Sequence, residues 1–160
     1  MNSESTGTER SDPRHRVIWA LRRAEMAVQT MKERQLRPIG MTASHYALLV
    51  SIDSEPGSAG ATLARRLNVT PQAVAALVAR LEDRGLLERR SHPRHAHVQE
   101  LHLTEPGRQA LRQAEEVMER IEQQVIELIG PDSSSAFRVA LDTLADSALE
   151  LPQAETLADR

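Results

Sequence analysis

Cysteine is absent from this 160-residue chain, which excludes disulfides, thiolate metal sites and thiol-based redox sensing. Aromatic residues are nearly absent too. One Trp, one Tyr and one Phe do not predict the stacking surface on which single-stranded nucleic acids bind. No hydrophobic run approaches the ~20 apolar residues of a membrane-spanning helix. Residues 1–11 lack the hydrophobic segment of a secretory signal, so we expect a cytoplasmic protein.

The patterns that carry catalysis are also missing. The chain has no cysteine nucleophile, no Gly-rich phosphate loop, and no Ser/His/acid set within a recognisable local motif. We therefore expect a protein that is not an enzyme and that needs no cofactor.

Charge is present but unevenly distributed along the chain, whose net charge is −3. Residues 61–98 carry seven arginines against three acidic residues, whereas residues 105–160 carry twelve acidic residues against five arginines. A basic segment within an acidic chain predicts a local surface for phosphates, with the acidic part held away from it.

The basic segment begins with two short helices joined by a tight turn. Residues 62–67 form an amphipathic helix closed by Asn68, a residue type that tolerates the left-handed conformation. Thr70 then caps a new helix whose first position is Pro71. Such a short connection predicts a helix-turn-helix, in which the second helix enters the major groove of DNA.

The second helix has a core face and an outward face. Its apolar stripe consists of Val74, Leu77, Val78 and Leu81, at spacings of three and four. The residues left on the outward face are Gln72, Ala73, Ala76 and Arg80. Gln pairs with adenine, Ala contacts a thymine methyl, and Arg reaches guanine or phosphate, so this face predicts base recognition.

A basic β-hairpin follows the second helix. Gly85 ends the helix, residues 86–90 and 98–103 predict two strands, and residues 91–95 predict the turn between them. An arginine at the tip of such a hairpin suits the narrow minor groove. The predicted fold class is therefore mainly α with a small β-hairpin wing: a winged helix-turn-helix plus N- and C-terminal dimerisation helices.

An ordered set of motifs resembles the MarR family of bacterial transcriptional regulators over residues 14–151. The motifs are Thr42-Ala43-Ser44-His45-Tyr46-Ala47-Leu48-Leu49, Leu63-Ala64-Arg65-Arg66-Leu67, Thr70-Pro71-Gln72, residues 81–89 and residues 103–108. The resemblance implies a homodimer on an inverted-repeat operator in double-stranded DNA, acting as a repressor that a small aromatic or anionic effector releases. The missing cysteine excludes the peroxide-sensing branch. Where many relatives have an Asp-x-Arg-like pair in the wing, this chain has residues 92–97, with Arg94 as the only arginine at the tip.

The long helices on either side have apolar surface in excess of what one small winged helix covers, which is compatible with the dimer that the resemblance implies. Apolar seams run along residues 17–31, ended by Pro38 and Gly40, and along a helix from Thr104 to Gly130, with a further amphipathic segment at 137–151. The expected organisation is a flexible N-terminus 1–12, an N-terminal dimerisation helix 13–37, a winged helix-turn-helix 42–103, C-terminal dimerisation helices 104–151 and a flexible tail 152–160. The expected dimer contacts are Val17, Leu21, Leu111, Met118, Ile121, Val125, Leu141 and Leu144. An intramolecular helical bundle is the alternative use of these seams.

Two sets of binding residues follow from this organisation. The predicted DNA contacts are Thr70, Gln72, Ala73, Ala76 and Arg80 on the second helix, Arg65, Arg66, Arg84, Arg89 and Arg90 mainly on phosphates, and Arg94 in the minor groove. The predicted effector contacts are Trp19 as an aromatic wall, Arg22 and Arg23 as cationic partners, and His15, His45 and Tyr46.

Three alternatives stay open at this point. The winged helix is also compatible with a protein-interaction or architectural module that has no operator of its own. Four histidines within one hairpin, His92, His95, His97 and His102, suggest a metal-responsive regulator, although the hairpin lacks the cysteine or acidic partners typical of a closed zinc site. The same histidines beside Arg94 also suggest a wing whose affinity for DNA strengthens as the pH falls.

Overall fold

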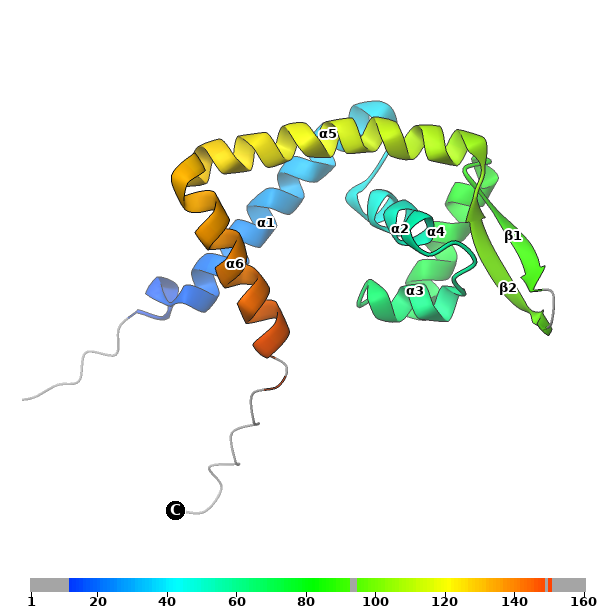
Figure 1. Ribbon diagram of the computed structural model, residues 1–160, viewed down its shortest axis with the longest axis horizontal. Helices are drawn as coiled ribbons and strands as arrows, with labels where there is room; N and C mark the ends of the chain where they lie inside the picture. The colour runs from blue at the N-terminus through cyan, green and yellow to red at the C-terminus, as the bar shows by residue number, and fades with distance from the viewer. Residues whose placement is uncertain (1–11, 93–94, 149, 151–160) are drawn as a thin grey trace, which may run out of the picture. The chain divides into compact units, whose positions relative to one another are not determined.

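The computed structural model describes residues 12–92, 95–148 and 150 of the chain. The described part is mostly helical with one antiparallel hairpin, as predicted (Figure 1). None of its helices is long and apolar enough to cross a membrane. The chain divides into two compact units, the first ending at Met118 and the second beginning at Glu119.

The elements are α1 (Val17–Leu36), α2 (Ala43–Ser54), α3 (Gly60–Arg66), α4 (Pro71–Asp83), β1 (Leu87–His92), β2 (His95–Leu103), α5 (Glu105–Ile129) and α6 (Pro131–Ser147), with 3₁₀ turns at Pro13–His15 and Arg37–Ile39.

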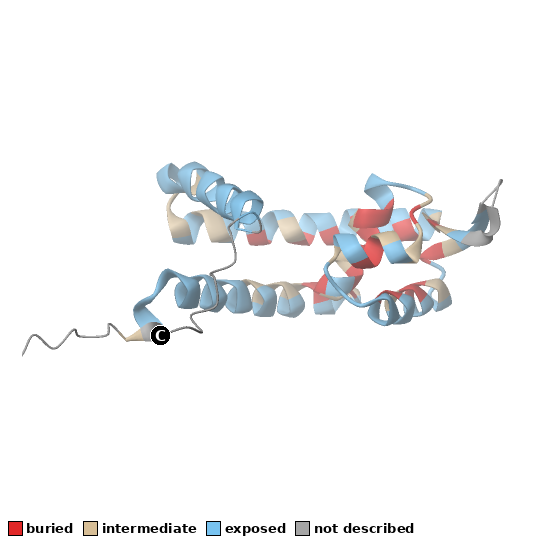
Figure 2. Ribbon diagram, turned by 90° about the horizontal axis from the view of Figure 1, so that it is seen from below, coloured by how far each residue is buried: buried red, intermediate tan, exposed pale blue. Residues whose placement is uncertain are grey.

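The core of the first unit is formed by the apolar sides of short helices. Figure 2 shows buried residues gathered on α2, α3, α4 and the first part of α5. On α4, Val74, Val78 and Leu81 are almost fully buried, as the stripe predicts, whereas Leu77 is half-buried. The largest fully buried side chains are Leu36, Leu48, Leu49, Ile52, Leu63, Leu81, Leu87, Leu101, Val74 and Val78.

The link between α3 and α4 has the predicted geometry. Asn68 has a φ of +52°, and the Val69 amide donates to the Ala64 carbonyl at 3.0 Å. The Thr70 hydroxyl accepts a hydrogen bond from the Ala73 amide at 3.1 Å, and Pro71 is the first residue of α4. The cap and the turn together determine where α4 starts.

The hairpin is longer than predicted. Leu87 pairs with Leu103 and Arg89 with Leu101, and the pairing continues to His92 opposite His95. Ser91, His92 and His95 therefore lie in strands, not in the predicted turn. Polar residues at the end of a hairpin resemble turn residues in sequence, so residue type alone does not show where the strands end.

The base of the hairpin is hydrogen-bonded to the loop that follows α2. The Gly57 amide donates to the Leu101 carbonyl at 3.0 Å, and the Leu101 amide donates to the Ser58 carbonyl at 3.2 Å. These bonds occupy one edge of β2 and hold the hairpin against the helices of the first unit.

Helix α5 begins at the predicted cap, where the Thr104 hydroxyl accepts from the Gly107 amide at 3.1 Å. Its buried positions are Leu111, Ala114, Val117 and Ile121, so the stripe includes Val117, which the sequence pattern missed, while Met118 and Val125 are half-buried. Leu111 and Ile121 are buried within a single copy and so add nothing to an exposed dimer surface. Gly130, with a φ of +95°, separates α5 from α6 as predicted.

Helices α1 and α6 expose several apolar side chains, and α5 exposes Leu128. Val17 and Ile18 of α1 are 78% and 76% exposed, and Leu21 is also exposed. None of the described residues of α6 is buried, and its exposed apolar side chains are Phe137, Val139, Leu141 and Leu144.

We expect Gly107→Ala to destabilise the first unit. A Cβ at this position would clash with the Leu86 carbonyl oxygen, a backbone atom that cannot move aside cheaply. Overpacking of this kind costs about 1–3 kcal/mol of unfolding free energy, measurable by urea denaturation. Gly60→Ala is the matched control, since the nearest atom, Val74 Cγ1, is 4.0 Å away. Equal stability of the two variants would contradict this interpretation.

Candidate nucleic-acid interface and a separate pocket

The outward face of α4 carries the residues that the sequence predicted there. Gln72, Ala73, Ala76 and Arg80 are all exposed, while the opposite side of the helix is packed into the core. Ala75 and Ala79 are exposed too, although sequence reasoning did not select them. The same helical spacing places them beside Gln72 and Ala76. The result is a face of small side chains with one amide and one cation, fixed on a rigid helix.

The six described arginines that were predicted to contact DNA, on bases or on phosphates, fall into two sets. Arg65 and Arg80 are exposed, and neither is ion-paired with another described residue. The other four are engaged within the chain. Arg66 pairs with Glu55 and donates to the Ser51 carbonyl, Arg84 donates to the Gly40 carbonyl at 2.9 Å, Arg89 pairs with Glu82, and Arg90 pairs with Glu88.

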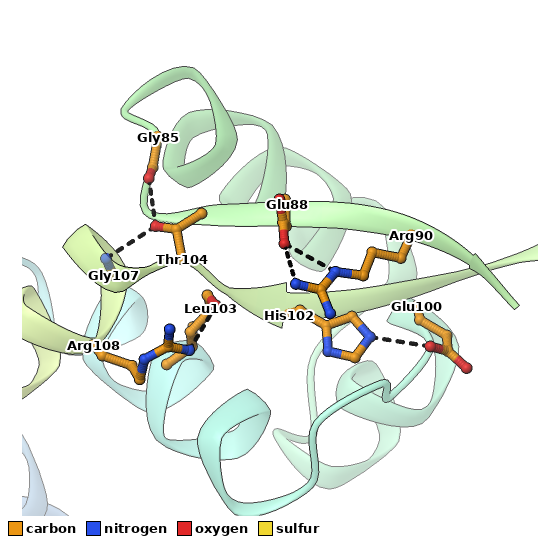
Figure 3. A network of polar contacts seen from close by, with 9 residues as sticks. All are labelled: Gly85, Glu88, Arg90, Glu100, His102, Leu103, Thr104, Gly107 and Arg108. Carbon is orange, nitrogen blue, oxygen red and sulfur yellow. Dashed lines mark hydrogen bonds and ion pairs between the residues drawn. The ribbon is translucent and has the colours of Figure 1, made fainter.

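The tip of the wing is only partly described. Arg94 lies outside the described residues, and the described features of His92, His95 and His97 are confined to their backbone. Glu100 faces His102, whose Nε2 lies 3.0 Å from Glu100 Oε2 (Figure 3). Within the described ranges, no three His, Cys, Asp or Glu side chains are grouped so as to hold a metal. The metal-responsive and pH-sensitive wings therefore stay predictions about the tip.

Arg89 and Arg90 lie on opposite faces of the hairpin. Arg90 is paired in register with Glu100, and Glu88 with His102, and these four side chains share one face (Figure 3). Arg89 shares the other face with the buried leucines of the hairpin, because side chains alternate along a strand.

A groove of about 390 Å³ lies on the Arg89 side, between α3, α4 and the wing. The Arg89 guanidinium and the Gln99 amide are its polar groups on the wing, and small or apolar side chains form its helical wall. Its lining residues are Ala59, Gly60, Ala61, Pro71, Val74, Ala75, Val78, Arg89, Gln99 and Leu101.

A separate cavity of about 310 Å³ lies on the other side of α4. It is mostly apolar, with Lys32 as its one cation, and its walls come from α1, α2, the α3–α4 link, α4 and α5. Its lining residues are Gln29, Lys32, Ala43, Ser44, Tyr46, Ala47, Leu67, Val69, Leu77 and Met118.

Only one of the predicted effector residues, Tyr46, lines this cavity. His45 is buried beside it, whereas His15, Trp19, Arg22 and Arg23 are exposed at or near the start of α1 and line no described cavity. Lys32 and Gln29 were missed. The signal that could have found them is their position, since they lie on the part of α1 nearest to its end, where Leu36 joins the core.

Burial determines the protonation of the two ring side chains of α2. Burial raises the pKa of the Tyr46 phenol, and the negative charge of Glu115 raises it further, so the phenol remains a hydrogen-bond donor. His45 is only 8% exposed, and neither ring nitrogen has a hydrogen-bond partner in the structure. Burial lowers the pKa of His45, Arg84 and Arg80 lower it further, and Glu33 opposes them.

Comparisons with known proteins agree with this geometry. Residues 39–96 match a family model described as MarR family. Over 109 residues the chain is 29% identical to the HTH-type transcriptional repressor Rv2887 of Mycobacterium tuberculosis, covering 68% of this chain and 78% of the repressor. The solved structure of the transcriptional repressor CouR bound to a 23-mer DNA duplex is similar, with a TM-score of 0.77, 29% identity, and coverage of 81% of this chain and 92% of CouR. The complex of M. tuberculosis Rv2887 with salicylic acid has a TM-score of 0.69 and 26% identity, and the match covers 81% of this chain and 96% of that chain.

Acid should destabilise the protein through His45. Its pKa in the folded chain lies below the ordinary value of 6.5, so below pH 6.5 the unfolded chain binds the proton more readily. The contribution of neutral His45 to the free energy of unfolding is fully present above pH 6.5. It is lost as the pH falls towards the lowered pKa. We expect the free energy of unfolding, measured by urea denaturation, to decrease from about pH 7.5 to about pH 5.5.

His45→Met removes the titrating group and keeps apolar bulk, so it should reduce this pH dependence. His15→Gln removes an exposed histidine and serves as the matched control. An unchanged pH dependence in His45→Met would show that other groups cause it.

Proposed function

Because the chain belongs to the MarR family of winged helix-turn-helix transcriptional regulators, we propose that it is a homodimeric repressor whose specific binding to duplex DNA ends when a small anionic aromatic molecule binds. The outward face of α4 carries this proposal: its base-contacting residue types are exposed on a helix whose start is capped and whose other side is buried. Binding to an operator implies a cytoplasmic location, and the proposal assigns no catalytic residue.

Base recognition is assigned to Gln72, Ala73, Ala76 and Arg80. The Gln72 amide matches the paired donor and acceptor of adenine, and the alanines allow close approach to thymine methyls. Thr70, at the cap, places the start of α4 against the duplex. Arg65 supplies a phosphate contact from α3, since it is exposed and has no ion-pair partner among the described residues.

Two copies are needed to read an inverted repeat. The exposed Val17, Ile18 and Leu21 of α1 and, in the second unit, the exposed Leu141 and Leu144 of α6 supply apolar surface that a single copy leaves uncovered. Covering such surface is the main driving force for association. On α5, Met118 and Val125 are half-buried and Leu128 is exposed, so these side chains are further candidates.

The effector site is assigned to the cavity that Lys32 and Tyr46 line. The Lys32 ammonium attracts a carboxylate, the Tyr46 phenol donates a hydrogen bond, and the apolar walls fit an aromatic ring. The salicylic acid complex of the similar Rv2887 protein supports this class of ligand. Leu67, Val69 and Leu77 belong to the same cavity, so a ligand there contacts both α4 and the link that orients it.

A winged helix that serves only as an architectural or protein-interaction module is the second candidate, since it needs no operator. It predicts weak binding that is independent of sequence and falls steeply with salt. Selection of bound duplexes from a random pool at physiological salt separates the two candidates. An enriched inverted repeat with half-sites about one helical turn apart supports the repressor, and no enrichment by a folded dimer supports the module.

With the selected operator, Gln72→Ala should weaken binding by about 1–3 kcal/mol and relax the preference at one base pair in each half-site. The reason is that the lost hydrogen bonds are made to one base and not to the backbone. Affinity is measured by fluorescence anisotropy with operator and scrambled duplexes. Equal losses for both duplexes would contradict the role of Gln72 in base recognition.

Lys32→Ala should weaken salicylate binding by about tenfold, because it removes a charged hydrogen-bond donor from an otherwise apolar cavity. Isothermal titration calorimetry measures the affinity. Arg34→Ala is the matched control, since Arg34 is a cation on the same helix that does not line this cavity. A similar loss from both variants would indicate a general charge effect and would contradict the assignment.

A further inference from the structure

Arg89 and Arg90 are adjacent in sequence and each is ion-paired, yet they face different surroundings. Arg89 Nε lies 3.1 Å from Glu82 Oε2, and the pair joins the wing to the last turn of α4. Arg90 Nε lies 2.9 Å from Glu88 Oε1, a neighbour on its own strand. Arg89 lines the groove between the wing and the helices, and Arg90 does not.

The residues that line the groove are suited to bind an anionic sugar-phosphate backbone. Its wing side presents the Arg89 cation and the Gln99 amide, both able to donate hydrogen bonds to phosphate oxygens. Its helical side presents Pro71 and Ala75, small apolar residues that allow a sugar to approach closely. Ala75 also belongs to the exposed outward side of α4, so the groove is continuous with the surface assigned to the bases.

We infer that this groove holds one sugar-phosphate strand of the bound duplex, and that Arg89 exchanges the Glu82 carboxylate for a phosphate when DNA binds. The inference rests on the proposed function and adds to it the path of the backbone. It also distinguishes two arginines that the sequence treats alike, since Arg90 stays with Glu88 on the outer face of the hairpin.

The exchange costs little because the Arg89–Glu82 pair is exposed. The side chains are 41% and 39% exposed, and pairs of this kind are weak in water. A phosphate offers Arg89 an equivalent partner, and neutralising it also releases a condensed counterion. Glu82 remains beside the DNA after the exchange, where its charge opposes binding. The wild-type carboxylate thus limits the affinity for every duplex, whatever its sequence.

Four single variants form two matched pairs: Arg89→Ala and Glu82→Gln at the groove, and Arg90→Ala and Glu88→Gln on the outer face. Affinities for the selected operator and for a scrambled duplex are measured by anisotropy over a range of salt concentrations. Arg89→Ala should weaken both duplexes by a similar factor of about ten and reduce the salt slope by about one. Glu82→Gln should strengthen both by about threefold to fivefold.

The outer pair should leave both affinities and the salt slope within about twofold of wild type. In the Arg89→Ala background, Glu82→Gln should strengthen binding by less than it does in the wild type, because no arginine is left for the carboxylate to hold and only its repulsion of the DNA is removed. Arg89→Lys retains the charge and should recover most of the salt slope. Thermal melting checks that each variant folds, and Glu82→Gln tests the inference even if Arg89→Ala does not fold.

Two results would overturn the inference while leaving the proposed function intact. In the first, the wild type binds its operator, but Arg90→Ala weakens binding as much as Arg89→Ala does. The other is a Glu82→Gln variant that binds DNA no more tightly than wild type, which would show that the ion pair only braces the wing. Failure of the folded wild-type dimer to select any sequence would instead contradict the proposed function itself.

Discussion

The hydrogen bond from the Ala73 amide to the Thr70 hydroxyl, next to left-handed Asn68, determines where α4 begins and how it leaves α3. The burial of Val74 and Val78 then determines the rotation of the helix about its axis. With start and rotation set, every other side of α4 has a defined neighbour: the wing through Glu82, the cavity through Leu77, and solvent on the face of Gln72 and Ala76. A helix started one residue later would direct a different set of side chains outward, since successive residues are about 100° apart.

This shared position of α4 gives a physical route from effector to DNA. Leu77 lines the cavity and Ala75 lines the groove, so the two proposed ligands contact opposite sides of one helix. Packed interiors do not deform continuously, so in this proposal a ligand against Leu77 acts on the position of the whole helix and not on one side chain alone. His45 lies in the same region, close enough to Arg80 and Arg84 for their charges to lower its pKa. A neutral imidazole there avoids placing a buried positive charge close to the cations of Arg80 and Arg84.

Local signals in the sequence were sufficient to predict where the helices begin and end. They were not sufficient to locate features that are built from distant parts of the chain. Thr70, Pro71, Asn68 and Thr104 act through bonds to near neighbours, so their roles could be predicted from residue type and spacing. The cavity could not be located in this way, because its walls come from five parts of the chain. Trp19 was predicted to contact the effector because it is the only tryptophan of the chain, yet it is exposed near the start of α1. Lys32, the cation that lines the cavity, lies on the later part of the same helix. Val117 was missed because positions 117 and 118 both fit a broad apolar stripe.

The pairing of the arginines changes how the basic segment is understood. Counting charges along residues 61–98 suggests a uniformly attractive surface, but Arg66, Arg89 and Arg90 are each held by a carboxylate. Among the described residues of this segment, the arginines without a carboxylate partner are Arg65 on α3, Arg80 on α4 and Arg84 at the end of α4. Long-range attraction therefore brings phosphate towards the two helices, and exchange at the wing follows only once the backbone is near.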